Sequence, residues 1–425
     1  MTDSSTDPHD PYAALRVRDF RLFLAGRMLS TIGQQMLDVG IGWELYERTH
    51  SALALGLVGL VLVLPIVALA LPSGHLADRH ERRGIVLTTQ VILAVCSLGL
   101  AVLSFERGPI PLVYVALFAI GMALAFNRPA TAAMLPQLVP ADDFANAVTW
   151  SSSGFQIASV VGPALGGAII GIRGQAGPVY IVDAVLALAF FVCVWAIRAR
   201  RVEQTSDRKA MTVASLVAGV VYVWRTKVIL AAITLDLFAV LFGGATTLLP
   251  IFAKDILHVG PAGFGWLRAA PSIGAFAMAI AITHRPPMRR AGRSVLLAVA
   301  GFGAATIGFG LSRSFALSMA LLLIAGGLDN ISVVVRHTLV QLRTPDAMRG
   351  RVSAVNGVFI DTSNELGGFE SGVTAAWLGP VVSVVAGGII TILVVATVAR
   401  LWPELREMGN LSAEDWGPEL EAGNG

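Results

Sequence analysis

The chain has 425 residues, of which 55% are hydrophobic and only 14% are charged, and its mean hydropathy is +0.72. Soluble globular domains carry about 25% charged residues, so this composition excludes an ordinary water-soluble fold and indicates that lipid surrounds most of the chain. The net charge is only +3, and the two cysteines, Cys96 and Cys193, lie in apolar runs, so neither a disulfide framework nor a zinc site is expected.

Twelve apolar segments follow a polar N-terminal tail, which lacks the basic start and short apolar core of a cleaved signal peptide. Each segment is close to the roughly 20 residues that cross a bilayer as a helix. Short polar turns separate most of them, so we expect an all-α membrane protein with twelve transmembrane helices. The expected spans are 20–46, 53–75, 84–105, 110–134, 145–172, 177–198, 226–252, 259–283, 293–312, 315–338, 348–374 and 380–402.

Most of the 31 Lys and Arg residues lie in the tails and in alternate turns on the side of the N-terminus. Cytoplasmic loops of membrane proteins carry such an excess of positive charge. We therefore expect a multi-pass protein of the inner (cytoplasmic) membrane with both termini in the cytoplasm. The same distribution argues against nucleic acid as a partner, because the basic residues follow one membrane face instead of lining a single groove.

The turn after the second span, residues 74–83, reads GHLADRHERR. Gly74 permits a neighbouring helix to approach closely, and Asp78 can accept from the exposed N–H groups at a helix start. Arg79, Arg82 and Arg83 can bind lipid phosphates or a carboxylate across the turn. The alternative is an ordinary basic turn on the cytoplasmic face.

The fifth span contains the sequence GPALGG, in which Gly162, Pro163, Gly166 and Gly167 are the notable residues. Small residues four apart allow close helix packing, and proline bends a helix. Tight packing without any role in transport is the alternative interpretation.

A longer polar stretch after the sixth span divides the chain into halves that repeat each other weakly. LPQLVP at 135–140 is echoed by LVQLRTP at 339–345, and both halves carry a glycine-rich stretch. Six spans repeated in one orientation predict two pseudo-symmetric six-helix bundles with a substrate site between them. The expected divisions are a cytoplasmic tail at 1–19, a bundle at 20–198, a linker with an interfacial helix at 199–225, a second bundle at 226–402 and an acidic tail at 403–425.

Ionisable and amide side chains occur inside several spans, where a charge costs about 2.5–3.5 kcal/mol unless it faces a cavity or a partner. Asp361 and Glu365 are four apart and share one helical face, a spacing that suits reversible protonation. A static pair with Arg268 is the alternative, and Asp183, near the outer end of its span, is expected to be structural. The candidates for proton coupling or substrate binding are Asp38, Asp236, Arg268, Asp329, Asp361, Asn364 and Glu365.

Residues 74–83 resemble the signature loop between helices two and three of the major facilitator superfamily, with Glu81 where the general pattern has glycine. The DRxERR form resembles the subgroup that contains the enterobactin exporter and macrolide-efflux-like proteins. Three further segments share this resemblance: LALGLVG at 53–59, NRPA at 127–130 and TPDAMRGRV at 344–352.

The resemblance implies that Asp78, with Arg82 or Arg83, latches a cytoplasmic gate against span eleven in the outward-open state. Gly74, Arg79 and Arg128 are counted with these gating residues. It also implies that the GPxxGG element is the antiporter motif of exporters. The upstream glycine of that motif is Ala158 here, so the match is partial.

The predicted function is proton-coupled export of a small organic molecule, a siderophore or a drug-like compound, by alternating access. Embedded carboxylates favour a substrate with some positive charge, whereas the resemblance allows an aromatic siderophore. An importer on the same fold and a non-transporting membrane sensor or scaffold are the alternatives. The sequence contains no phosphate-binding loop and no catalytic or metal-binding constellation, so we expect no enzyme, no cofactor and no metal site. The expected partners are the substrate and membrane lipid, and the functional unit is expected to be a monomer.

Overall fold

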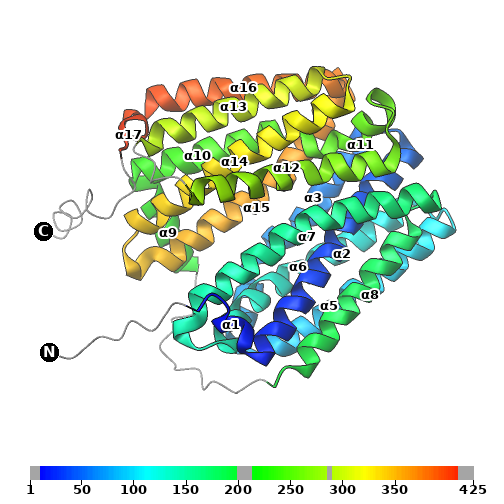
Figure 1. Cartoon of the computed structure of the whole chain (residues 1–425), viewed down its shortest axis with the longest axis horizontal. Coiled ribbons are helices and arrows are strands. Elements are labelled where there is room, and N and C mark those ends of the chain that lie inside the picture. Colours follow the sequence, from blue (N-terminus) through cyan, green and yellow to red (C-terminus); the bar gives the residue numbers. More distant parts are fainter. Residues whose placement is uncertain (1–9, 199–212, 285–289, 410–425) are drawn as a thin grey trace, which may run out of the picture.

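The structure, a computed structural model, describes residues 10–198, 213–284 and 290–409. Nearly all of these residues are helical, and no strand occurs among them. This confirms the predicted all-α fold class. The helices form two bundles that lie side by side (Figure 1).

The first bundle, called here the N-terminal half, begins with a short helix before its long segments. Ser51 starts the third helix by accepting a hydrogen bond from the Ala54 backbone N–H at 3.3 Å. The second predicted span is broken near Leu69, four residues after Pro65, so it forms two helices. The helices are α1 (Ala13–Arg16), α2 (Arg18–Thr49), α3 (Ala52–Ala68), α4 (Ala70–Arg79), α5 (Arg82–Phe105), α6 (Ile110–Leu138), α7 (Phe144–Arg173) and α8 (Gly177–Ala196), with a 3-10 turn η1 (Ala141–Asp143) before α7.

The second bundle, the C-terminal half, follows the linker. Its first span is irregular, because the α-helix ends at Gly243 and the chain continues through 3-10, α and π turns to Ile256. The elements are α9 (Val213–Arg225), α10 (Lys227–Gly243), η2 (Ala245–Leu248), α11 (Leu249–Ile251), η3 (Phe252–Ile256), α12 (Gly260–Thr283), α13 (Ala291–Leu311), α14 (Phe315–Arg343), α15 (Asp346–Leu378), α16 (Pro380–Leu401) and α17 (Pro403–Glu407).

Within the described part of the chain, nine helical segments are long and apolar enough to cross a membrane. The other three predicted spans correspond to α2, to α3 with α4, and to α15. Of these, α3 is apolar but has only 17 residues, and the other two carry several ionisable side chains. The protein is therefore a multi-pass membrane protein, and the total of twelve spans stays a prediction.

The core shows how the halves are joined. The first and last described helices, α1 and α17, lie together with α9 at one end of the molecule, called here the termini end (Figure 1). Near this end each half has its own cluster of buried apolar residues, one around Phe20 and Phe190 and the other around Leu235 and Leu339. At the opposite end, the far end, one continuous cluster includes residues of both halves. Among the described residues, the two halves therefore share a packed core only toward the far end.

Candidate substrate cavity between the halves

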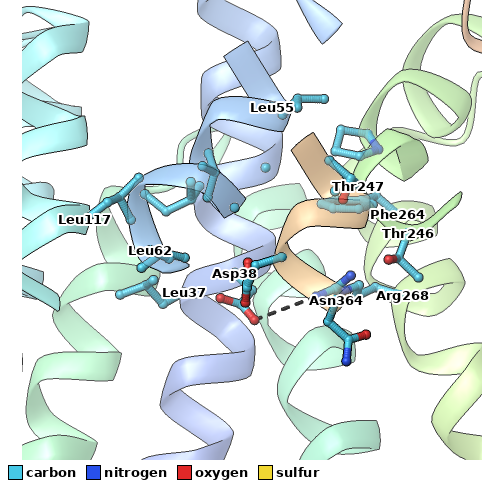
Figure 2. A pocket seen from close by; sticks show the side chains of 17 residues that line it. Leu37, Asp38, Leu55, Leu62, Leu117, Thr246, Thr247, Phe264, Arg268 and Asn364 are labelled. Atoms are coloured by element: carbon cyan, nitrogen blue, oxygen red, sulfur yellow. Dashed lines mark ion pairs between the residues drawn. The ribbon is translucent and has the colours of Figure 1, made fainter. Parts of the chain in front are cut away.

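A cavity of about 720 Å³ lies between the two halves, between α2, α3 and α6 on one side and η2, α11, α12 and α15 on the other (Figure 2). Its walls are mainly apolar, with a small set of polar groups that face one another. These groups are Asp38, Thr246, Thr247, Arg268, Asn364 and Glu365. An apolar cleft with a few convergent polar groups is the usual form of a small-molecule site.

A second cavity, of about 950 Å³, adjoins the first and extends into the N-terminal half between α2, α3, α5, α6, α7 and α8. The two cavities share Leu37, Asp38, Leu62 and Glu365 as wall residues, so they adjoin in one region between the helices. Five of the predicted site residues meet around it: Asp38, Arg128, Arg268, Asn364 and Glu365.

Asp38 on α2 and Arg268 on α12 form an ion pair across the first cavity, with 3.7 Å between Arg268 Nη2 and Asp38 Oδ2. Their side chains keep 41% and 30% of their surface exposed. A long, partly solvated pair contributes little stability. It can therefore open when the charge on Asp38 or the ligand in the cavity changes, and it joins the two halves directly.

Glu365 on α15 faces both cavities and lies against α3. A Cβ atom placed on Gly59 would lie 3.3 Å from Glu365 Oε2 and still closer to the Glu365 carbonyl oxygen. Only glycine at position 59 lets the two helices approach this closely. The neighbouring Asn364 donates a hydrogen bond to the Ile360 carbonyl at 2.9 Å and lies beside Arg268 (Figure 2).

Asp183 on α8 is a cavity residue that the sequence analysis assigned to structure alone. It is buried, lines the second cavity, and accepts a hydrogen bond from Ser97 Oγ at 2.5 Å. Gly33 on α2 makes room for its carboxylate. The position of Asp183 near one end of an apolar segment concealed this, because distance along the chain does not reveal which side of a helix faces the cavity.

Asp236 and Asp329 line neither cavity. Asp236 on α10 forms an ion pair with Arg336 on α14, inside the C-terminal half, where the two side chains are only 7% and 3% exposed. The structure thus does not support a place for Asp236 in the central site, because its carboxylate is sealed between two helices of one half. The side chain of Asp361 lies outside the described residues.

The predicted gating residues after α4 contact the N-terminal half. Arg82 Nη1 donates to the Ala133 carbonyl at 3.1 Å. Arg83 donates to the carbonyls of Val194 and Trp195 at the end of α8, at 3.2 and 2.6 Å. Carbonyls at a helix C-terminus favour such a cation.

The latch implied for the same turn stays a prediction. The side chains of Asp78 and Arg79 lie outside the described residues. A Cβ atom on Gly74 would meet no described atom within 4 Å, so no described part of a helix approaches it closely in this conformation.

The glycines of the fifth span serve two contacts on different faces of α7. A Cβ atom on Gly162 would collide with Ile32 and Gln35 of α2, and one on Gly166 would press against α2 one turn further on. Gly167 and the Pro163 carbonyl instead contact Gly265 on α12, across the boundary between the halves. The motif therefore packs α7 within its own half and also holds the halves together near the far end.

A polar and aromatic layer closes the far end, and sequence reasoning did not find it. The Tyr46 hydroxyl on α2 donates to Asp255 in η3. Trp43 stacks with Phe264 of α12 at 6.2 Å between ring centroids. The Lys254 Nζ atom lies 5.9 Å from the centroid of the Trp43 ring. All three contacts join the two halves, and none of them forms a sequence motif.

The bundles and the cavity between them define a membrane transporter of the major facilitator type. Over residues 9–422 the sequence matches the family described as "Transmembrane secretion effector", and the chain belongs to this family. It is 28% identical to the multidrug efflux pump Tap of Mycolicibacterium fortuitum, covering 91% of this chain and 96% of that protein. It is 24% identical to the enterobactin exporter EntS of Citrobacter koseri, covering 91% and 92%.

Solved structures with the same fold have much lower sequence identity. A bacterial homologue of the human lysosomal transporter Spinster, in an inward-facing and occupied conformation, superimposes with a TM-score of 0.72 at 14% identity over 94% of this chain and 99% of that one. A POT family transporter in complex with a thioalcohol-conjugated peptide gives 0.72 at 12% identity, over 91% and 96%. These similarities establish the fold.

Proposed function

We propose that the protein is a secondary active exporter of a small organic molecule, driven by the proton gradient and working by alternating access. The observation that carries the proposal is the Asp38–Arg268 ion pair. It crosses a cavity between two halves whose described residues share a core only at the far end. The direction of transport is supported by the relatives named as an efflux pump and an exporter.

The conformation corresponds to the stage at which substrate enters from the cytoplasm. In this proposal the termini end faces the cytoplasm of a cell whose inner membrane holds the protein, as the distribution of Lys and Arg favours. The far end is closed by the α3–α15 and α7–α12 contacts. Rocking of the halves would open these contacts and bring the cytoplasmic ends together.

A proton would act on this equilibrium through the acidic wall residues. While Asp38 is ionised it attracts Arg268 across the cavity and favours the present arrangement of α2 and α12. A proton on Asp38 removes that attraction and frees Arg268, and Glu365 beside α3 can accept a proton from the same space. In this scheme no cofactor or catalytic step is needed, one chain forms the whole pathway, and the protein is not an enzyme.

Transport into everted membrane vesicles, with the interior acidified by respiration, tests the proposal. The wild-type protein should accumulate the fluorescent cation ethidium or the anion salicylate against its gradient, and a protonophore should abolish the accumulation. Asp38→Asn and Glu365→Gln should each lower accumulation at least about tenfold, with unchanged protein levels, because the amides cannot exchange a proton.

Three results would contradict this proposal. Accumulation only in right-side-out vesicles would indicate an importer. Vesicles that move neither probe, or variants Asp38→Asn and Glu365→Gln that transport as well as the wild type, would rule out proton-coupled export of these compounds. Arg173→Gln, at an exposed position at the far end of α7, is the matched control and should transport normally.

A further inference from the structure

A third cavity, of about 650 Å³, lies between α2, α6 and α7 and plays no part in the scheme above. Arg27 contributes to it from α2, and Ser151, Ser152, Phe155 and Gln156 contribute from α7. Phe155 also lines the second cavity, so the two spaces adjoin. Arg27 lies on the same helix as Asp38 but roughly 16 Å nearer the termini end, at a rise of 1.5 Å per residue. The third cavity is therefore on the termini side of the central site.

The described polar groups of this cavity offer many hydrogen-bond donors and include no acidic side chain. Arginine offers five N–H donors and cannot lose its charge, and the serine and glutamine side chains add further donors. No described Asp or Glu lines the cavity, and no described acidic side chain forms an ion pair with Arg27. Ser151 Oγ is buried and makes no hydrogen bond to any described group. Such a set of groups fits an oxyanion, which accepts several hydrogen bonds and balances the positive charge.

Retaining an arginine here is costly without such a ligand. Arg27 lies well inside α2, and the cavity wall beside it includes the apolar residues Leu135 and Val148. A charged side chain at this depth faces a water-filled cavity or a partner and marks a substrate or ion pathway. Phe155 lines both this cavity and the second one, where its ring can contact the apolar body of a ligand held by Arg27.

We infer that Arg27, Ser151, Ser152 and Gln156 form an oxyanion-binding subsite, which takes a carboxylate or phosphate group of an amphipathic substrate on its way into the central cavity. The inference rests on the proposed export function and narrows its substrate class to small organic anions. The second cavity, which adjoins this one, holds Arg128, and the central cavity beyond it holds Arg268, paired with Asp38, so a cation lies at each stage of the path.

Binding of salicylate and of its neutral amide, salicylamide, to the purified protein in phosphatidylcholine nanodiscs tests the subsite directly. The two compounds have nearly the same size and aromatic ring, so their difference reports the charge. Arg27→Gln should weaken salicylate binding by about tenfold or more, since a charge-assisted bond is lost, and should leave salicylamide binding unchanged. Arg27→Lys should restore most of the salicylate affinity, and Arg173→Gln on α7 should change neither.

The same oxyanion chemistry occurs in lipid headgroups, so the binding is repeated in discs that contain phosphatidylglycerol. A fall in salicylate affinity in those discs for the wild type but not for Arg27→Gln means that a lipid phosphate competes for the subsite. That result supports an oxyanion site whose ligand is a lipid, and it overturns the assignment of the site to a substrate. If the wild type binds salicylate with the same affinity in both kinds of disc, the result supports a substrate as the ligand of the subsite. Equal salicylate binding by wild type and Arg27→Gln, with both variants folded, overturns the subsite. If salicylate binds through Arg27 but no compound is transported, the subsite stands and the export function fails.

Discussion

Asp236 and Arg336 show that a charged side chain inside a span can be structural. Because the pair is buried within the C-terminal half, we expect Asp236→Ala to lower the free energy of unfolding by about 3–5 kcal/mol, since an uncompensated guanidinium remains. The double variant Asp236→Leu/Arg336→Met should recover most of this stability. Thermal unfolding of the protein in detergent measures both. A double variant that folds but loses transport in vesicles would instead place the pair in the coupling pathway.

The sequence could predict that charges inside spans matter, but not which of them meet. The cost of burying a charge singled out Asp38, Arg268 and Glu365 but also Asp236, whereas the position of Asp183 near the outer end of its span indicated a structural role. In a soluble helix the polar face reveals which side points to water. Here lipid and protein core are both apolar, so the pattern does not show which face of a helix meets the cavity. Arg27 escaped notice for the same reason.

At the scale of single helices, α7 allows a matched comparison of its two glycine faces. Gly167→Leu should push α12 away from α7 and weaken the closed far end, while leaving the N-terminal half intact. Gly162→Leu should disturb the packing of α7 on α2 and lower the unfolding temperature of the protein.

The two effects can be separated with one cysteine at Ile41, a wall position of the central cavity, in a background without Cys96 and Cys193. Gly167→Leu should raise the rate at which a membrane-impermeant thiol reagent labels this cysteine from the far side by about fivefold or more. The physical reason is that the bulky side chain disfavours the closed arrangement, shifting the population of states. Unchanged labelling, with transport intact, would show that the α7–α12 contact does not control access.

The helices themselves were largely predictable, and the departures have local causes. Apolar length and polar turns placed the segments within a few residues of their observed positions for most of the chain. The break between α3 and α4 follows Pro65, and the irregular stretch after α10 begins at Gly243 and Gly244. A proline or glycine inside an apolar run is tolerated in some helices and breaks others, depending on the neighbouring helices. The positions of these breaks therefore could not be predicted from the sequence alone.

At the scale of the whole molecule, the far-end contacts between the halves give the most direct test of alternating access. A reversible bifunctional thiosulfonate across Tyr46→Cys and Asp255→Cys should hold α2 and η3 together, as their hydrogen bond does in this structure. Substrate binding should then continue, because the path from the termini side stays open, whereas transport in vesicles should fall to background and recover when a reductant removes the cross-link.

The control cross-link joins Glu44→Cys and Tyr180→Cys, which contact each other within the N-terminal half at 2.9 Å between the native side chains. It attaches the same reagent at the same end of the molecule without connecting the halves. If each half moves as a rigid unit, this second cross-link should leave transport unchanged. Only the cross-link that joins the two halves should then inhibit transport. Inhibition by both cross-links would mean that the N-terminal half deforms during transport, and inhibition by neither would mean that the far end does not open at α2 and η3.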